Sequence, residues 1–534
     1  MLFFAFQRFV PAPASGMIVK MEEKMKNERN TETGNDNIKS AGSSIAVQAG
    51  ILAAATIIVR IIGLLYRAPL TAIIGDEGNG YYGAAYNIYM IILILSSNSL
   101  PAAISRQMST KIAVGEYKNA QRAFHCALAY SLIVGTAGSL LLYFGAGVLV
   151  KPNAVPVLRV FAPTIFLFGI LGAVRGAMGS ALGTGSGVTV ALLFMAAAYF
   201  RHRKSFFNRI HSDVKHAEPY ARVMKSTILV ITPFIASSFI LNLTTTLDQM
   251  IYLNMMIDGR RLPEAAVTTV FGLFSNKAVV ITNIPISVAT AVSAAIIPNI
   301  ATAYASGDIK ETRRRSVNAS RMALIISIPC AVGLMVLARP VTMLMFPQWD
   351  TLELASVLLA LQAVTVIFLS VGTITNAVLQ AIGRMNMPIV SAGVSLIIQT
   401  AALAFFLRYT DWGIYAMVLV SVLYAAIIFA LNELFLRHYL DLRFSAVQVY
   451  GKPILSAVLM GAAAYGTYGV VFAAAGRITG EYFANFMATV PAIFVAIIVY
   501  FFLLIRMGGF TEDDILGLPK GTKLVRLLKK LHWL

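Results

Sequence analysis

Residues 484–505 read ANFMATVPAIFVAIIVYFFLLI, an apolar stretch without a charged side chain. A bilayer core about 30 Å thick needs roughly 20 such residues for a helix to cross it, so this stretch predicts a transmembrane helix. In lipid, every backbone polar group must be bonded within the protein, and a helix achieves this by itself. Similar stretches recur from residue 45 onward with only short polar breaks. The sequence therefore predicts an all-α polytopic membrane protein.

The composition leads to the same prediction. Of the 534 residues, 58% are hydrophobic and 13% are charged, and the mean hydropathy is +0.75, far above that of soluble domains. The 43 Lys and Arg against 24 Asp and Glu give a net charge of +19. In a membrane protein this excess collects in cytoplasmic loops, so it does not indicate a nucleic-acid partner. Cys126 and Cys330 lie in separate apolar runs, which predicts neither a disulfide nor a zinc site.

Hydropathy places thirteen spans along the chain. They cover residues 45–70, 84–104, 124–149, 155–176, 183–200, 226–255, 267–300, 320–345, 353–382, 388–408, 412–436, 450–474 and 484–505. Before them, residues 1–42 are mostly polar and lack a convincing signal peptide, so a disordered cytoplasmic tail is expected. After them, residues 511–534 end in KLVRLLKKLHWL, which predicts a basic amphipathic tail on the inner leaflet.

The chain resembles itself at an offset of 192 to 200 residues. The tripeptide AAI at 102–104 precedes a glycine, an acid, a lysine and an arginine with the same spacing as AAI at 294–296. Further on, five residues within 157–177 recur at an offset of 200 within 357–377, namely Val157, Leu158, Phe168, Gly172 and Ala177. Two homologous helical lobes with a central cavity between them are a common transporter design. The expected domains are an N-terminal lobe at 43–215, a C-terminal lobe at 216–445, and two additional helices within 446–510.

The first lobe has one span fewer than the second. Only the span 183–200 separates 155–176 from the basic segment 201–215, whereas two spans follow 353–382. A deletion, a segment that does not fully cross, and a sequence-assembly error are the alternatives. The glycine-rich GSALGTGSG at 179–187 favours a deletion from a fourteen-span pattern. Because basic segments favour the cytoplasm, the segment 201–215 and both termini are expected there.

A few cations inside the spans are candidate substrate ligands. A charge in the bilayer costs about 2.5 to 3.5 kcal/mol on insertion scales, so such side chains usually face a cavity or a partner. Arg60 and Arg67 share one face of the first span, because seven residues turn a helix by about 700°. Arg60 is near mid-span and is expected to line the cavity, whereas for Arg67 snorkelling to the membrane surface is an equal alternative. Lys277 lies within a span and is expected to line the cavity.

Polar residues in two further spans complete the predicted site. Asn98 and Arg106 lie on either side of Pro101, which interrupts the second span. Such a break predicts a substrate-lining segment, although Arg106 is equally well explained as the first residue of a cytoplasmic loop. Asp248 is expected to be the only deeply placed acid, either as the counter-ion of a buried cation such as Lys277 or Arg60, or as a site for H⁺ or Na⁺. The resulting electropositive cavity suits phosphate.

Several other kinds of site are not predicted. The sequence contains no GxxxxGK[ST] loop, so ATP is not the evident energy source. No catalytic residue, metal site or cofactor is predicted. A glycan polymerase or transferase would need clustered carboxylates or histidines near a membrane face, and the sequence shows no such cluster.

Four stretches resemble a known transporter family. They are VRIIGLLYRAPLTAIIG at 59–75, SLPAAISRQMSTKIAVGEY at 99–117, LDQM at 247–250, and SNKAVVITNIPISVATAVSAAIIPNIATAYASGD at 275–308. They are similar to the polysaccharide-exporter branch of the multidrug/oligosaccharidyl-lipid/polysaccharide exporter superfamily, in particular to the group of stage V sporulation protein B and MurJ-type lipid II flippases. The resemblance implies fourteen helices in two lobes, with a cavity formed largely by helices one, two, seven and eight. Arg60 and Gly63 match the family's first-helix arginine and glycine, and Arg67 is displaced by about one residue from a second arginine.

The resemblance also implies a function. Such flippases are thought to hold the pyrophosphate of an undecaprenyl-linked sugar with cavity arginines while the lipid stays in the membrane. This chain is therefore expected to translocate a polyprenyl-pyrophosphate-linked cell-wall precursor, such as lipid II or a polysaccharide repeat unit, across the cytoplasmic membrane. Its expected partners are that lipid-linked oligosaccharide, the bilayer, and Na⁺ or H⁺ as a coupling ion. A cation-coupled multidrug exporter and a non-transporting scaffold remain as alternatives.

Overall fold

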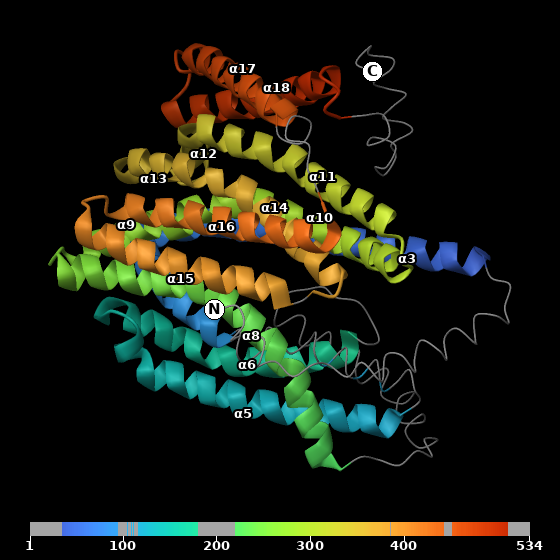
Figure 1. Ribbon diagram of the computed structural model, residues 1–534. Helices are drawn as coiled ribbons and strands as arrows, with labels where there is room; N and C mark the ends of the chain where they lie inside the picture. The colour runs from blue at the N-terminus through green and yellow to red at the C-terminus, as the bar shows by residue number, and fades with distance from the viewer. Residues whose placement is uncertain are drawn as a thin grey trace. The chain divides into compact units, whose positions relative to one another are not determined.

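The protein is helical throughout the part that the structure describes. The computed structural model describes residues 35–93, 116–179, 219–384, 386–442 and 451–510, together with residues 104, 108 and 111. Within these residues there is no β-strand (Figure 1), which confirms the predicted all-α class. Residues 52–534 form one compact unit and residues 1–51 a separate one, and the contacts described below lie within the larger unit.

The first two predicted spans belong to one long helix with a break inside it. The helix α3 covers Asn35–Leu93 and has non-helical backbone angles at Gly75, with φ of 70° and ψ of 176°. A positive φ suits glycine, which lacks a Cβ. The break therefore separates the span predicted at 45–70 from the one predicted at 84–104, whose last residues lie beyond those described.

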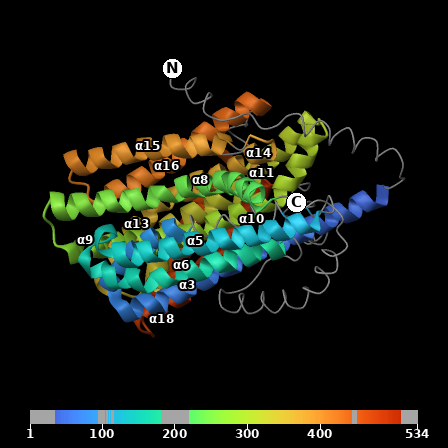
Figure 2. The same cartoon turned by 90° about the horizontal axis from the view of Figure 1, so that it is seen from below.

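Two antiparallel helices pack against the second segment of α3. The helices α5 (Tyr117–Leu149) and α6 (Val155–Gly179) are joined through the short helix η2 (Pro152–Ala154) and lie side by side in Figure 2. Thr164 of α6 donates to the Tyr89 hydroxyl of α3 at 3.0 Å. The rings of Tyr89 and Phe161 lie 5.1 Å apart. The spans predicted at 124–149 and 155–176 are thereby confirmed.

The second half of the chain supplies most of the remaining helices. They are α8 (Tyr220–Leu253), η3 (Asn254–Gly259), α9 (Glu264–Gly272), η4 (Leu273–Ala278), α10 (Val279–Ala305), α11 (Ile309–Val336), α12 (Ala338–Met345), α13 (Trp349–Gln362), α14 (Val364–Ala381), α15 (Asn386–Tyr409) and α16 (Ile414–Leu440). The segments η3 and η4 are π-helical, a geometry that is rare and frequent at functional sites. Each span predicted between residues 226 and 436 has its helix here, with the one at 320–345 divided between α11 and α12.

Two further helices pack against the second half. The helices α17 (Lys452–Ala475) and α18 (Glu481–Arg506) lie side by side in Figure 1. Tyr500 of α18 is buried, and its hydroxyl donates to the Ile325 carbonyl of α11 at 2.7 Å. In the described part of the chain, nine helices are long and apolar enough to cross a membrane, α17 and α18 among them. The last two predicted spans are thereby confirmed.

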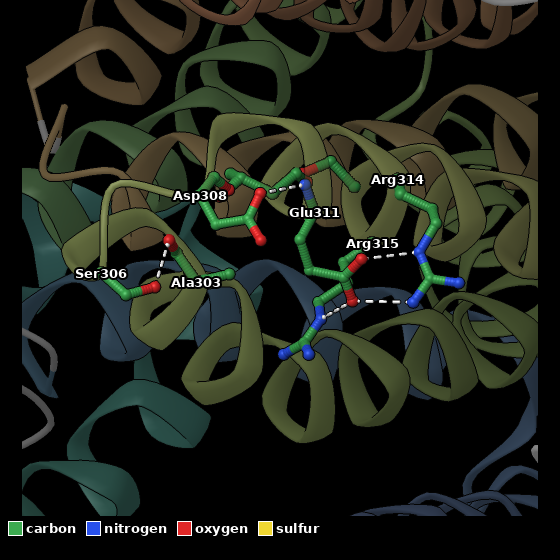
Figure 3. A network of polar contacts seen from close by, with 8 residues as sticks. Ala303, Ser306, Asp308, Glu311, Arg314 and Arg315 are labelled. Atoms are coloured by element: carbon green, nitrogen blue, oxygen red, sulfur yellow. Dashed lines mark hydrogen bonds and ion pairs between the residues drawn. The ribbon is translucent and has the colours of Figure 1, made fainter.

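The internal repeat is visible where two helices begin. Glu116 is the N-cap residue of α5, and Asp308 is the N-cap residue of α11, 192 positions later. The Asp308 carboxylate accepts the backbone N–H of Glu311 at 2.9 Å, which satisfies one of the free donors at the helix start. Figure 3 shows the Glu311 carboxylate between Arg314 and Arg315, with nitrogen to oxygen distances of 2.7 and 2.8 Å. Both helices therefore begin after an acidic residue at equivalent positions of the repeat, and of the two it is Asp308 that caps its helix with its side chain.

The connection between the lobes starts and finishes at the same end of the helices. The Arg122 guanidinium lies 4.7 Å from the centre of the Tyr220 ring, so the beginning of α8 lies beside the beginning of α5. Because α6 runs antiparallel to α5, Gly179 also lies at that end. The predicted span 183–200 and the segment 201–215 lie outside the described residues.

We therefore predict that residue 205 is on the cytoplasmic side, together with the beginnings of α5 and α8. In a chain with Cys126→Ala and Cys330→Ala, Ser205→Cys should resist an impermeant maleimide in intact cells and react once the membrane is permeabilised. Ile478→Cys is the control at the opposite end, because Ile478 is exposed in the turn between α17 and α18, and it should react in intact cells. Equal labelling of both cysteines in intact cells would contradict the orientation.

Candidate functional site

Lys277 is buried in η4 and paired with an acid from the other half of the chain. Its side chain is 1% exposed, and Nζ lies 2.6 Å from the Oδ1 atom of Asp76, which is 9% exposed. Asp76 directly follows the break at Gly75 and begins the second segment of α3. An ion pair this deeply buried depends on both partners, because removing either one leaves an uncompensated charge.

The start of α13 completes the surroundings of this pair. Lys277 Nζ donates to Gln348 Oε1 at 3.0 Å and lies 3.4 Å from the Thr351 hydroxyl oxygen. The Thr351 hydroxyl in turn donates to the second carboxylate oxygen of Asp76. The ring of Phe346 has its centre 5.5 Å from Lys277 Nζ, which adds a favourable cation–π contact. Three segments of the chain thus meet at one charged group.

Arg67 reaches the residue next to Lys277. Its Nη1 donates to Asn276 Oδ1 at 3.1 Å, and Asn276 Nδ2 donates to the Asn79 carbonyl at 2.6 Å. Arg67 comes from the first segment of α3 and Asn79 from the second, so η4 is bonded on both sides of the break at Gly75. One predicted substrate-binding cation, Arg67, therefore bonds to the residue that precedes another, Lys277. We call Asp76, Asn79, Asn276, Lys277, Gln348 and Thr351 the α3–η4 junction.

Glycines allow the backbones to approach closely at this junction. A Cβ built on Gly272 would lie 2.7 Å from the Gly80 Cα, and one built on Gly80 would lie 2.9 Å from the Thr268 carbonyl carbon. Both distances are shorter than any ordinary carbon contact. The two segments can therefore meet in this way only because neither residue has a side chain.

Further polar contacts extend the interface beyond the junction. Asn87 of α3 donates to the Gln249 side chain of α8 at 2.7 Å, and Gln249 donates to the Ala84 carbonyl at 3.0 Å. At the surface, Lys151 pairs with Asp258 at 2.8 Å. A cavity of about 310 Å³ lies beside these contacts, and its polar lining includes Tyr81, Lys151, Gln249, Asn254 and Thr268. The second segment of α3 is thus held to the second half along its length.

Asp248 lies in a different polar cluster. It is 7% exposed, and one of its carboxylate oxygens accepts the side-chain N–H of Gln399 from α15. The other oxygen, Asp248 Oδ1, and the amide oxygen Gln399 Oε1 are buried without a hydrogen-bond partner among the described residues. The interpretation of Asp248 as the partner of Lys277 is wrong, because Lys277 pairs with Asp76. Asp248 is also not the only buried acid among the described residues, because the side chain of Asp76 is buried as well.

Three of the predicted site residues are not placed by these contacts. The backbone of Arg60 belongs to α3, but its side chain lies outside the described part of the structure, as do Asn98 and Arg106. Their roles stay predictions.

Sequence reasoning missed the residues that hold Lys277, namely Asp76, Gln348 and Thr351. Asp76 and Gln348 lie between predicted spans, and Thr351 lies two residues before one, so hydropathy assigns them to loops. The glycine directly before Asp76 was a usable signal, because a glycine that separates two apolar runs often marks a break where a polar group faces inward. No comparable signal singles out Gln348 or Thr351.

Comparison with known proteins identifies the family. Residues 151–488 match the family model described as "Lipid II flippase MurJ", and residues 45–179 match the model "Polysaccharide biosynthesis protein". The chain belongs to the lipid II flippase MurJ family. This confirms the resemblance drawn from residues 59–75, 99–117, 247–250 and 275–308.

Two relatives from Bacillus subtilis (strain 168) are similar in sequence. "Lipid II flippase MurJ" is 23% identical over 65% of this chain and 75% of its own length. "Uncharacterized membrane protein YabM" is 21% identical over 90% of this chain and 96% of its own length.

Solved structures share the fold. A "Lipid II flippase MurJ, inward closed conformation" has a TM-score of 0.57 at 16% identity, covering 86% of this chain and 98% of that chain. An inward-facing MATE family transporter of the MOP superfamily has a TM-score of 0.54 at 17% identity, covering 71% and 93%. At these identities the similarity shows the fold alone. The chain is therefore a multi-pass membrane protein with the MurJ and MATE type of helical fold.

Proposed function

We propose that this chain is a flippase for a polyprenyl-pyrophosphate-linked cell-wall precursor, such as lipid II or a polysaccharide repeat unit. The observation that carries the proposal is that Arg67 and Lys277 both make polar contacts across the interface between the two halves, Arg67 with Asn276 and Lys277 with Asp76. Membership of the MurJ family supports the same substrate class. The proposed location is the cytoplasmic membrane, with both termini on the cytoplasmic side.

The chemistry of these side chains fits a phosphate-bearing headgroup. Arginine offers a planar fork that binds two phosphate oxygens, and lysine supplies a compact point charge. We propose Arg60, Arg67, Asn98, Arg106 and Lys277 as the substrate contacts. The proposed contacts include four cations, whereas the acid beside them, Asp76, is paired with Lys277. This excess of positive charge among the proposed contacts favours an anionic cargo over the drug cation of a multidrug exporter.

Transport of fluorescent lipid II tests the proposal. The purified protein is reconstituted into vesicles that carry the labelled lipid in both leaflets, and a membrane-impermeant reagent then quenches the outer leaflet. A flippase makes the inner pool accessible, whereas protein-free vesicles keep about half of the signal. If the inner pool stays protected from the reagent both with lipid II and with a polysaccharide-linked lipid, the proposal is wrong and a non-transporting scaffold is favoured. Transport of a drug cation alone would favour the multidrug exporter.

We also propose that Asp248 binds the ion that couples transport to a gradient. The observation behind this is the pair of unpartnered buried oxygens, Asp248 Oδ1 and Gln399 Oε1, because a small cation or a proton would satisfy them. We expect Asp248→Asn to keep the contact with Gln399 but to reduce gradient-driven flipping at least tenfold. The measurement is lipid II flipping with and without an imposed Na⁺ or H⁺ gradient. If the variant responds to both gradients like the parent, Asp248 is only a structural partner of Gln399.

A further inference from the structure

The ion pair between Asp76 and Lys277 has features that a purely structural contact would not need. The Lys277 side chain is 1% exposed, and polar atoms of Asp76, Gln348 and Thr351 lie within 3.4 Å of its Nζ. Yet its charged partner among the described residues comes from the far side of the interface, from α3. The charge that is expected to receive the substrate is therefore already neutralised by the protein.

Asp76 lies where its withdrawal would open the interface. It follows Gly75, whose φ of 70° marks the break between the two segments of α3. A Cβ on Gly75 would meet nothing within 4 Å, so the break has open space around it. A glycine at such a break can change direction more freely than other residues, because it has no side chain of its own. Movement of Asp76 away from Lys277 would also carry Asn79 and Gly80 away from η4.

We infer that Asp76 occupies the place of the substrate's phosphate on Lys277, so that binding of the anionic headgroup displaces Asp76 and releases the α3–η4 junction. A pyrophosphate carries more negative charge than a carboxylate, so Lys277 prefers it. The same negative charge repels Asp76 at short range. The contact that keeps this end closed is thus the one that the substrate breaks. This inference rests on the proposed function, because it takes the cargo to be a pyrophosphate lipid.

One inter-residue distance across the closed end would report the release. Spin labels at Pro152→Cys and Leu262→Cys lie in exposed turns on the two sides that Lys151 and Asp258 join. Double electron–electron resonance is measured in lipid nanodiscs, with Cys126→Ala and Cys330→Ala in the background. The probes are undecaprenyl pyrophosphate and, as its uncharged match, undecaprenol. The protein without added lipid should show the short distance, and undecaprenyl pyrophosphate but not undecaprenol should add a longer one.

Variants of the Asp76–Lys277 pair distinguish release of the α3–η4 junction from general loss of the fold. Asp76→Asn keeps the size of the side chain and should raise the ratio of open to closed protein about tenfold without any ligand. Asp411→Asn makes the same chemical change in an exposed ion pair with Arg260, whose two partners both belong to the second half, and should leave the distance unchanged. The double variant Asp76→Asn/Lys277→Met removes both charges, so it should be closed again and should no longer respond to undecaprenyl pyrophosphate.

The outcomes distinguish this inference from the proposed function. If the parent protein flips lipid II but Asp76→Asn keeps the short distance, the inference is wrong and the function stands. The inference is equally wrong if undecaprenyl pyrophosphate leaves the parent distance unchanged while lipid II is flipped. A parent protein that neither flips lipid II nor responds to the pyrophosphate lipid overturns both.

Discussion

Replacing Arg60 by alanine is expected to abolish flipping while the protein still inserts into the membrane. Arg60 is near the middle of the first predicted span and shares a helical face with Gly63 and Arg67, where a charge is tolerable only if a cavity or a counter-charge receives it. Alanine removes a bidentate contact to phosphate. Hydrogen bonds to charged groups contribute about 1.5 to 3 kcal/mol each, so the loss should exceed a hundredfold.

Comparison with two other substitutions makes this prediction specific. Arg60→Lys keeps the charge but replaces a planar fork with a point charge, so this variant should flip lipid II more slowly than the parent but not lose flipping altogether. Arg159→Ala is the matched control, because Arg159 is an exposed arginine of α6, and it should flip at the parental rate. Accessibility of lipid II at the outer face is measured in cells that depend on this protein, with membrane abundance determined in parallel. Parental flipping by well-expressed Arg60→Ala would show that the electropositive-cavity mechanism is wrong.

Hydropathy was sufficient to predict most of the helices, because the hydrogen-bonding requirement of a backbone in lipid is met within each helix. A backbone in lipid must satisfy its own hydrogen bonds, and a run of about 20 apolar residues does so as a helix. The repeat also needed only sequence, and it is visible again in the acidic caps Glu116 and Asp308. Interruptions within the helices were harder to predict. The change from α11 to α12 and the π-helical turns η3 and η4 depend on packing between helices rather than on apolar length.

The candidate site was predicted only in part, because its partners are brought together by tertiary structure. Lys277 was identifiable as a cation within an apolar run, because the residues next to it in the sequence are enough to show this. Its pairing with Asp76 joins positions 201 residues apart and requires α3, η4 and α13 to converge. The position of Lys277 inside a π-helical segment also changes the direction of its side chain relative to a regular helix. Periodicity along the sequence does not contain that information.

The close approach of Gly272 and Gly80 leads to the last prediction. Gly272→Ala is expected to wedge the α3–η4 junction open and to reduce lipid II flipping at least tenfold. The added Cβ would lie 2.7 Å from the Gly80 Cα and 2.9 Å from the Gly80 nitrogen, and backbone atoms cannot rotate away as a side chain can. Overpacking of this kind costs about 1 to 3 kcal/mol. Separation of α3 from α9 and η4 relieves the clash, so the cost falls on the closed state alone.

The spin labels at positions 152 and 262 measure this effect directly. Gly272→Ala should show the longer distance without added lipid, and undecaprenyl pyrophosphate should change it little, since the closed state is already depleted. Gly466→Ala is the matched control, because a Cβ on Gly466 of α17 would meet nothing within 4 Å, and both its distance and its flipping should equal those of the parent. A closed distance and parental flipping in Gly272→Ala would mean that α3 and η4 do not need to separate, so that the junction is not the closed end of a transport pathway.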